Sequence, residues 1–170
     1  MNIAKIVTVC AAWGVLALVS CGKLVATDGN IDVIPLPEKV VAGEGAFVLK
    51  PTTSVVLYFA PENIDKAVDL WRDVMEETLG VTTLKVADGG DIGGVKRNVV
   101  NVRKDESMGD EQYRLEVRPH HIDIYASKAN GVFYAFQTLR QMIPSEAFEF
   151  EGERRVEIPV CTIDDKPYFA

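Results

Sequence analysis

Two stretches of the chain repeat apolar residues at the spacing of an α-helix. In the first, Pro61 to Leu79, the apolar positions follow i, i+3, i+4, i+7, i+10, i+11 and i+15, which is one helical face. Pro61 suits the first turn and Gly80 the position just past the end. The spacing predicts a helix that buries this face, with Trp71 in the core rather than at a sugar-binding surface. The face consists of Ile64, Ala67, Val68, Trp71, Val74, Met75 and Leu79.

The second stretch, Ala129 to Ile143, has the same periodicity. Ser127 precedes it as a candidate N-cap, and Pro144 follows it, where a helix cannot continue. We expect this helix to pack on the same core as the first. Its apolar face consists of Val132, Ala135, Phe136, Leu139, Met142 and Ile143.

Alternation of apolar and polar residues predicts a β-hairpin just before the second helix. Residues 113–117 alternate, and so do residues 122–125. The segment between them, Arg-Pro-His-His, is typical of a turn. Adjacent histidines on a strand would point to opposite faces, so His120 and His121 are not expected to share a metal ion.

Other runs of β-forming residues complete the pattern. Residues 31–40 predict an edge strand, because Pro35 and Pro37 cannot donate to a central ladder. Near the end, Val160 to Ile163 predict a strand, and Asp164, Asp165 and Pro167 predict a turn. The remaining predicted strands lie within 46–51, 54–60, 83–89 and 98–104.

Each predicted helix follows a run of strands. This order predicts an α/β fold of the α+β sandwich type, a mixed β-sheet with two helices packed on one face. The chain has 170 residues, of which 48% are hydrophobic and 25% charged, so one globular domain is expected.

The first twenty residues differ in composition from the rest. Lys5 precedes a long uncharged run, and small residues follow, which is the order of a secretory signal. The segment Leu18-Val19-Ser20-Cys21 resembles the lipobox of bacterial lipoproteins, in which cleavage precedes a cysteine that receives lipid. We therefore expect Cys21 to anchor the chain to a membrane of the bacterial cell envelope, periplasmic or outer. A retained membrane anchor and an ordinary signal peptide are the alternatives.

Charge and cysteine usage limit the possible partners. The formal charge is −7, and removal of residues 1–20 would take one lysine and no acid, leaving −8. A net acidic chain is a poor candidate for binding nucleic acid or anionic lipid. After cleavage and lipidation only Cys161 remains, so no internal disulfide is expected. Cys161 lies in an apolar strand pattern and is interpreted as a core residue.

No established catalytic motif is present, and the residues predict no catalytic, substrate-binding or metal site and no cofactor. Adjacent acids can serve glycoside hydrolysis, but Asp105-Glu106 and Asp110-Glu111 lie in a polar loop where charges are usually solvated. A hydrolase acting through Asp110-Glu111 remains a hypothesis. The glycine-rich segment 87–98 lacks the order of a phosphate loop and is interpreted as a surface turn.

A family resemblance adds what spacing does not show. Residues 129–143 resemble the signature G-x-[FY]-Y-A-x-Q-T-L-x-Q-[LM], found before the catalytic barrel of family-twenty glycoside hydrolases, the β-N-acetylhexosaminidases. Residues 110–117 resemble the family strand E-[GA]-Y-x-L-x-V, with Gln112 where glycine is common. Residues 31–40 resemble its opening I-P-x-P strand, and 156–170 its bridge I-x-D-x-P-x-F-x-[WY]-R-G. The positions taken as the family signature are Gly131, Tyr134, Gln137, Thr138, Leu139, Gln141, Asp164 and Pro167.

The resemblance implies the non-catalytic N-terminal domain of a β-N-acetylhexosaminidase. In the family the sugar-binding arginine, the catalytic Asp-Glu pair and the aromatic pocket follow this region, and none has a counterpart here. The family mechanism is substrate-assisted, with attack by the 2-acetamido oxygen. A (β/α)8 barrel alone takes about 250 residues, so the catalytic barrel is expected to be absent. A glycan would be bound only through that barrel.

The resemblance also divides the chain. Residues 1–20 are expected to be the lipoprotein signal, 21–30 a lipidated tether, 31–164 the accessory domain and 165–170 the truncated start of the barrel. We expect a fragment or truncated product that is inactive alone, folded, frayed from about Asp164 and carrying an exposed apolar patch there. Two alternatives stay open: a stand-alone lipoprotein that binds a glycan, with Tyr125 as an exposed aromatic, or a protein; and the related domain of family-eighty-four N-acetylglucosaminidases.

Overall fold

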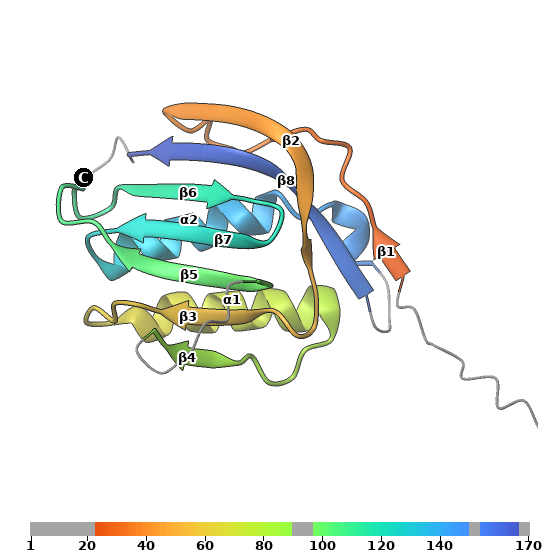
Figure 1. The fold of residues 1–170 in the computed structure, drawn as a ribbon, viewed down its shortest axis with the longest axis horizontal. Coiled ribbons are helices and arrows are strands. Elements are labelled where there is room, and N and C mark those ends of the chain that lie inside the picture. The colour runs from red at the N-terminus through yellow and green to blue at the C-terminus, as the bar shows by residue number, and fades with distance from the viewer. Residues whose placement is uncertain (1–22, 90–96, 150–153, 167–170) are drawn as a thin grey trace, which may run out of the picture.

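A computed structural model describes residues 23–89, 97–149 and 154–166. An eight-stranded mixed sheet forms one layer, and two α-helices cover one of its faces (Figure 1). The strands lie in the order β1-β8-β6-β7-β5-β3-β4, and β2 pairs with β8 beside this path. The predicted sandwich with both helices on one face is confirmed, and the described residues contain no closed barrel.

The two predicted α-helices begin and end close to their predicted bounds, as α1 (Ile64–Leu79) and α2 (Ala129–Gln141). A 3-10 helix that was not predicted, η1 (Ser145–Ala147), follows α2. The strands are β1 (Lys23–Val25), β2 (Lys39–Leu49), β3 (Ser54–Leu57), β4 (Val86–Asp88), β5 (Val99–Lys104), β6 (Tyr113–Val117), β7 (His121–Ala126) and β8 (Arg154–Asp165).

The core lies between the sheet and the two helices. Every residue of the two predicted apolar faces is buried. Trp71 of α1 stacks on Phe136 of α2 with 5.1 Å between ring centroids, so the helices pack on each other as well as on the sheet. Gly80 ends α1 with φ of 67°, a left-handed conformation that glycine adopts without steric cost. The core role predicted for Trp71 is confirmed.

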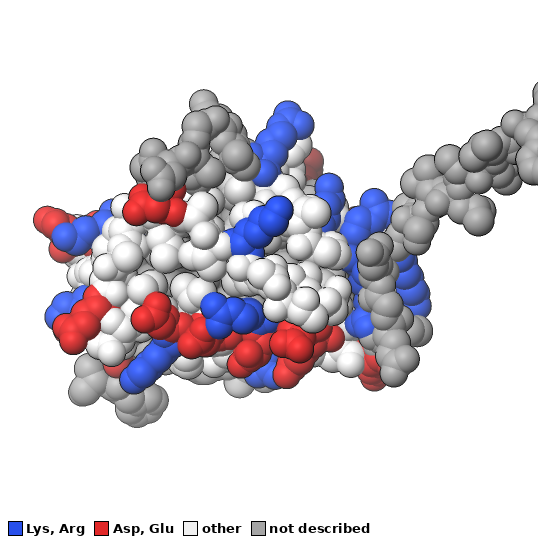
Figure 2. Space-filling model, turned by 90° about the horizontal axis from the view of Figure 1, so that it is seen from below, with Lys and Arg blue, Asp and Glu red and all other residues white. Residues whose placement is uncertain are grey.

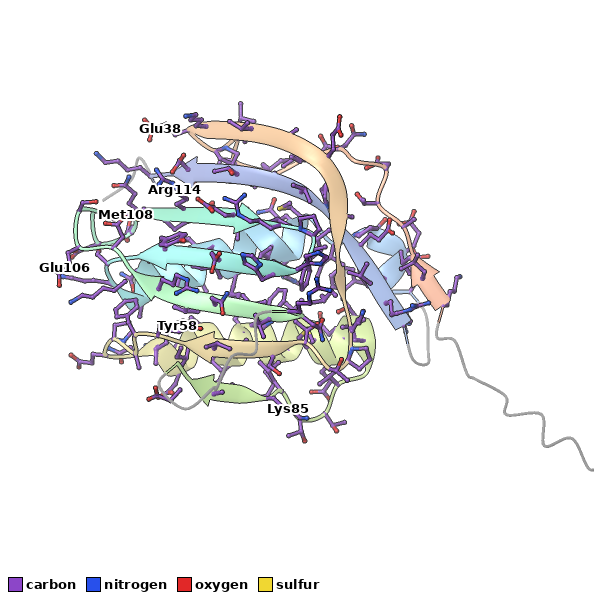
Figure 3. All side chains as sticks on the ribbon, viewed as in Figure 1. Glu38, Tyr58, Lys85, Glu106, Met108 and Arg114 are labelled. Atoms are coloured by element: carbon purple, nitrogen blue, oxygen red, sulfur yellow. The ribbon has the colours of Figure 1, made fainter. Side chains whose placement is uncertain are left out.

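The other face of the sheet is not covered by a helix. Strands alternate their side chains, so Ile122 and Ile124 of β7 face the core while Asp123 and Tyr125 face outward. Figure 3 shows this outward face toward the viewer, with Arg114 on β6 and Tyr58 just after β3. At the edge formed by β4 and α1, Figure 2 shows acidic and basic side chains mingled in a band, so neither charge sign dominates there.

The segment 31–40 departs from its prediction. Residues 31–38 lie outside the strands, and β2 starts only at Lys39 and continues to Leu49 with a register shift between Ala42 and Ala46. The prolines at 35 and 37 explain this, since neither has an N–H to donate to a neighbouring strand. The edge position is confirmed for β2, which pairs only with β8 among the described strands.

Three local predictions at turns were wrong. Ser127 does not cap α2; its hydroxyl donates to the Gly109 carbonyl oxygen (2.9 Å), and Lys128 occupies the N-cap position. His121 is not in the turn but opens β7, because the hairpin closes one residue earlier, with the Arg118 N–H donating to the His121 carbonyl (3.0 Å). Asp164 and Asp165 do not form a turn either, because they are the last residues of β8.

The two ends of the described domain are also more ordered than expected. Within the predicted tether, Lys23–Val25 form β1, which pairs in parallel with β8 and buries Val25. At the other end, Asp164 pairs across the sheet with Lys39 and with Arg114. The prediction of fraying from Asp164 is therefore wrong at that residue. Cys21 and Pro167 lie outside the described residues.

Candidate functional site

An apolar hollow lies beside α2. It has a volume of about 240 Å³ and is bounded by the loop of residues 33–36, by α2 and by the end of β8. We call it the α2 groove. Its lining consists of Val33, Ile34, Pro35, Leu36, Tyr113, Tyr134, Gln137, Thr138, Gln141, Asp165 and Lys166.

The base of the α2 groove is a buried polar contact. The Tyr113 hydroxyl, on the first residue of β6, lies 2.6 Å from the Thr138 hydroxyl on α2. It also donates to Asp165 Oδ2 at the end of β8 (3.4 Å). Burial raises the pKa of Tyr113, because the phenolate would lose its hydration there. Tyr113 therefore stays a neutral hydroxyl that joins three elements, and it has no catalytic ionisation at neutral pH.

Two hydrogen bonds, one from the loop of residues 33–36 and one from Glu38 just after it, hold this segment beside the groove. The Ile34 N–H donates to Gln141 Oε1 of α2 (2.8 Å), and the Glu38 N–H donates to Asp165 Oδ1 (3.2 Å). These bonds replace the ladder that the proline-containing segment cannot make. They leave the side chains of Ile34 and Leu36 pointing outward, each 81% exposed.

Gly131 allows α2 to pack closely against the backbone just before β6. A Cβ at this position would lie 2.4 Å from the Gln112 carbonyl oxygen and 3.0 Å from Ala126 Cβ. Contacts of 2.4 Å are not tolerated, so any larger residue would push α2 away from the start of β6. This glycine sets the distance on which the Tyr113–Thr138 contact depends.

The described signature positions lie in three places. Leu139 is fully buried, and Gly131 and Thr138 hold α2 on the sheet. Tyr134, Gln137 and Gln141 line the groove, and so does Thr138. Asp164 lies away from it, in an ion pair with Arg114 (2.5 Å) on the open face. Asp165, two residues before Pro167, occupies the aspartate position of the bridge motif and contacts the groove.

The open face carries a second polar cluster, centred on Asp123. Asp123 Oδ1 accepts from Asn101 Nδ2 and from Arg103 Nε, both at 2.9 Å, and Oδ2 lies 3.1 Å from His121 Nε2. Burial, the largest single influence, lowers the pKa of Arg103, but the hydrogen bond and the charge of Asp123, together with Tyr58 and Tyr125, raise it by more, so the net shift is upward. The Arg103 guanidinium lies over the Tyr58 ring at 4.2 Å. These contacts join strands β5 and β7, although Asn101 Oδ1 is buried without a hydrogen-bond partner among the described residues.

The acid pairs named as catalytic candidates do not converge. Hydrogen bonds from Ser107 lower the pKa of Asp105, and the Lys104 ammonium lowers that of Glu106. Asp110 pairs with Lys128 at 2.8 Å. Asp105, Glu106 and Asp110 are thus each bonded to a cation or a hydroxyl and not to a second acid, whereas Glu111 Oε2 is buried without a hydrogen-bond partner among the described residues. This arrangement does not hold one carboxyl protonated beside one ionised, which acid–base hydrolysis requires.

The remaining candidates are structural. Cys161 is buried, and burial raises its pKa to about 11, so it is neither a thiolate nor accessible; its predicted core role is confirmed. Tyr125, expected to be exposed, is half-buried. Over the described ranges no group of three or more His, Cys, Asp or Glu side chains has metal-site geometry. In the same ranges no helix is long and apolar enough to cross a membrane.

Comparison with known proteins decides the family. A sequence model described as "Glycosyl hydrolase family 20, domain 2" matches residues 30–166. The chain belongs to glycosyl hydrolase family 20. A β-N-acetylhexosaminidase of Cellulomonas fimi is 32% identical over 145 residues, which are 83% of this chain and 27% of the relative. A β-hexosaminidase of Porphyromonas gingivalis is 25% identical, covering 84% of this chain and 18% of the relative.

Solved structures agree with this family 20 assignment. The β-N-acetylhexosaminidase of Streptomyces coelicolor matches with a TM-score of 0.62 and 28% identity, over 81% of this chain and 27% of that chain. The enzyme of Streptomyces plicatus matches with a TM-score of 0.63 and 29% identity, over 81% and 26%. The chain therefore spans about a quarter of the length of these relatives, and the comparisons favour family twenty over family eighty-four.

Sequence reasoning missed two features of this site. The outward Ile34 and Leu36 were hidden because the segment was interpreted as a strand; the Pro-Leu-Pro spacing was the signal that it is a loop. The Asp123 cluster was also missed, although Asn101 and Arg103 alternate with valines and so had to share the outward face of β5.

Proposed function

We propose that this chain is the non-catalytic domain of an exported β-N-acetylhexosaminidase. The parent enzyme would remove terminal N-acetylglucosamine or N-acetylgalactosamine by the substrate-assisted, retaining route of its family. The match to domain 2 of family 20 supports the proposal, and so do relatives named β-N-acetylhexosaminidase and β-hexosaminidase. The chain covers 27% and 18% of those relatives, which leaves room in them for a catalytic domain.

One observation carries the non-catalytic role. The signature side chains hold elements together: Thr138 contacts Tyr113, Gln141 accepts from Ile34, and Gly131 permits close packing. A catalytic signature would instead place a nucleophile or an acid–base pair in a hollow. The α2 groove is lined mainly by apolar side chains, with Asp165 as its one acid among the described residues.

The proposed attachment to the cell envelope depends on Cys21. Its support is the order of Lys5, an uncharged run and the segment Leu18-Val19-Ser20-Cys21. Lipid at Cys21 would hold the domain at the membrane surface, with the enzyme facing its glycan substrate. Replacement of Cys21 by serine should release the protein into the soluble fraction, and metabolic labelling with a fatty acid should no longer mark it.

The function is tested on the native protein. An antibody raised against this chain should capture from cell-envelope extract a polypeptide of about four times its length. The captured material should release nitrophenol from the nitrophenyl N-acetyl-β-glucosaminide. Captured protein of any length without this activity would contradict the proposal.

The purified 170-residue chain provides the matching control. It should release no nitrophenol, because Asp110 pairs with the Lys128 ammonium at 2.8 Å and not with a second acid. Release that disappears in the double variant Asp110→Asn/Glu111→Gln would instead make the loop acids catalytic.

A further inference from the structure

The first described strand lies where a flexible tether was expected. β1 pairs in parallel with the start of β8, with Lys23 opposite Arg154, and it buries Val25 in the core. The chain is therefore part of the folded domain from Lys23 onward. Only Gly22 separates Lys23 from Cys21, the residue proposed to carry lipid.

The length of this connection limits how far the domain can stand from a membrane. An extended chain spans at most about 3.3–3.6 Å per residue, so Lys23 lies within about 7 Å of Cys21. A flexible tether as far as residue 30 would instead reach about 30 Å. The headgroup layer on each side of a bilayer is about 5–8 Å thick, since a bilayer measures about 40–45 Å in total and its hydrocarbon core about 30 Å. Lipid on Cys21 would therefore bring β1 into the headgroup layer.

The side chains of β1 and its neighbour are suited to this layer. Val25 faces the core, so Leu24, the preceding residue of the strand, faces the opposite side, where it is 43% exposed. Leu24 lies opposite Arg155 in the sheet register, and an arginine side chain is long enough to carry its charge to the level of the phosphates. Lys23 is exposed at the start of the strand. An apolar side chain next to two cations is typical of surfaces that lie at a membrane interface.

Acidic side chains lie at the same end of the domain. Asp28, Asp32 and Glu146 line a hollow of about 630 Å³ beside β1, together with Lys23. The two charge signs oppose each other there, and the whole chain is net acidic, so anionic lipid is not expected to attract this surface. The covalent anchor and its short connection, rather than charge, would bring β1 to the bilayer.

β8 carries the chain from β1 to the opposite end of the sheet. It starts at Arg154, beside β1, and ends twelve residues later in the sequence count at Asp165 (Figure 1). At about 3.3 Å per residue, its two ends are up to about 36 Å apart. A domain joined after residue 166 would thus begin at the end of the sheet that lies away from β1.

We propose that the β1 edge of this domain is a membrane-contact surface, with lipid headgroups as the partner. Leu24 lies among the headgroups, Lys23 and Arg155 contact lipid phosphates, and β8 spans from this surface to the point where the chain leaves the sheet. The domain is a rigid spacer set directly on the membrane and not a module on a flexible tether. This inference rests on the part of the proposed function that attaches the chain through Cys21.

Hydroxyl-radical footprinting on vesicles tests the membrane contact. Leu24 is 43% exposed and Val86, on β4 at the opposite edge of the sheet, is 41% exposed, so Val86 is a matched internal reference. The lipidated protein, purified from cells and reconstituted in phosphatidylcholine vesicles, is compared with the same protein produced without residues 1–21. The proposal predicts that attachment lowers the ratio of Leu24 oxidation to Val86 oxidation at least fivefold.

Three outcomes would overturn the proposal. A lipid-labelled, vesicle-bound protein with an unchanged oxidation ratio refutes the membrane contact and leaves the proposed attachment and enzyme function intact. A ratio that is equally low in the protein without residues 1–21 shows that protein, and not lipid, covers Leu24. A wild-type protein that carries no lipid at Cys21 refutes the proposed attachment, and the membrane contact with it.

A pair of insertions gives an independent result. About ten glycine and serine residues placed between Gly22 and Lys23 would lengthen the connection by up to about 35 Å, so the oxidation ratio should return to within twofold of that of the protein without an anchor. The same insertion between Asp28 and Gly29, in the exposed turn after β1, leaves the anchor connection unchanged and should leave Leu24 protected. Equal oxidation ratios in the two variants contradict the proposal that the short connection holds β1 at the membrane.

Discussion

The two faces of the sheet are stabilised by different interactions. Toward the helices, Val100, Leu115 and Ile124 are fully buried and belong to the same hydrophobic core as Trp71 and Phe136. One residue away on the same strands, outward side chains form ion pairs that remain partly in water. The covered face therefore provides most of the stability, because apolar burial contributes far more than exposed ion pairs. The residues that mark the family lie mainly on or beside the covered face.

The largest loss of stability is expected when the side chain at the centre of the covered face is truncated. Trp71→Ala should lower the free energy of unfolding of the purified chain by about 3–5 kcal/mol, because it leaves a cavity against Phe136. Urea titration followed by circular dichroism measures this. Trp71→Phe is the control: it keeps a ring and removes an indole N–H that has no partner among the described residues. A loss as large for Trp71→Phe as for Trp71→Ala would show that the cavity is not the cause.

A matched pair of threonines compares the faces with the same chemical change. Thr138→Val removes the 2.6 Å partner of the buried Tyr113 hydroxyl and should cost about 1–2 kcal/mol. Thr162→Val, on β8 and opposite Glu116 in the open-face register, should change the free energy of unfolding by less than about 0.5 kcal/mol. Equal losses of unfolding free energy for the two variants would contradict the difference between the two faces.

The smallest effect is expected for an ion pair of the open face. Arg114→Ala breaks the contact with Asp164. The Arg114 side chain is 44% exposed and the Asp164 side chain 24% exposed. Exposed pairs of this kind contribute about 0–1 kcal/mol, and salt screens them. We expect a small loss in low salt that disappears in about 1 M sodium chloride, where the screening length is about 3 Å. A loss above 2 kcal/mol that persists in high salt would show that the open face is not dispensable.

Periodicity predicted the covered face well and the connections poorly. The apolar stripes of α1 and α2 are continuous and long, so their helical form and their buried residues followed directly from the spacing. The start of β2 and the end of β8 did not follow, since they depend on partners far away in sequence. Asp164 resembled part of a turn because of its neighbours Asp165 and Pro167, but Arg114 and Lys39 hold it in the sheet.

The groove was beyond prediction from sequence for the same reason. Tyr134 and Gln137 could be named as signature positions, but their common location required the loop of residues 33–36 to fold back on α2. That folding depends on the Ile34–Gln141 bond, which joins residues 107 apart in sequence. Local sequence patterns carry no information about such a contact.

A domain exchange tests most directly whether this chain is a structural part of a hexosaminidase that contributes no catalytic residues. Residues 30–166 would replace the matching segment of the Cellulomonas fimi relative, to which the chain is 32% identical over 145 residues. The account predicts that the chimera hydrolyses the nitrophenyl N-acetyl-β-glucosaminide with a kcat within about tenfold of that enzyme, a difference of about 1.4 kcal/mol in activation free energy. A folded chimera that binds the product N-acetylglucosamine normally and yet has lost kcat by a thousandfold or more would contradict it.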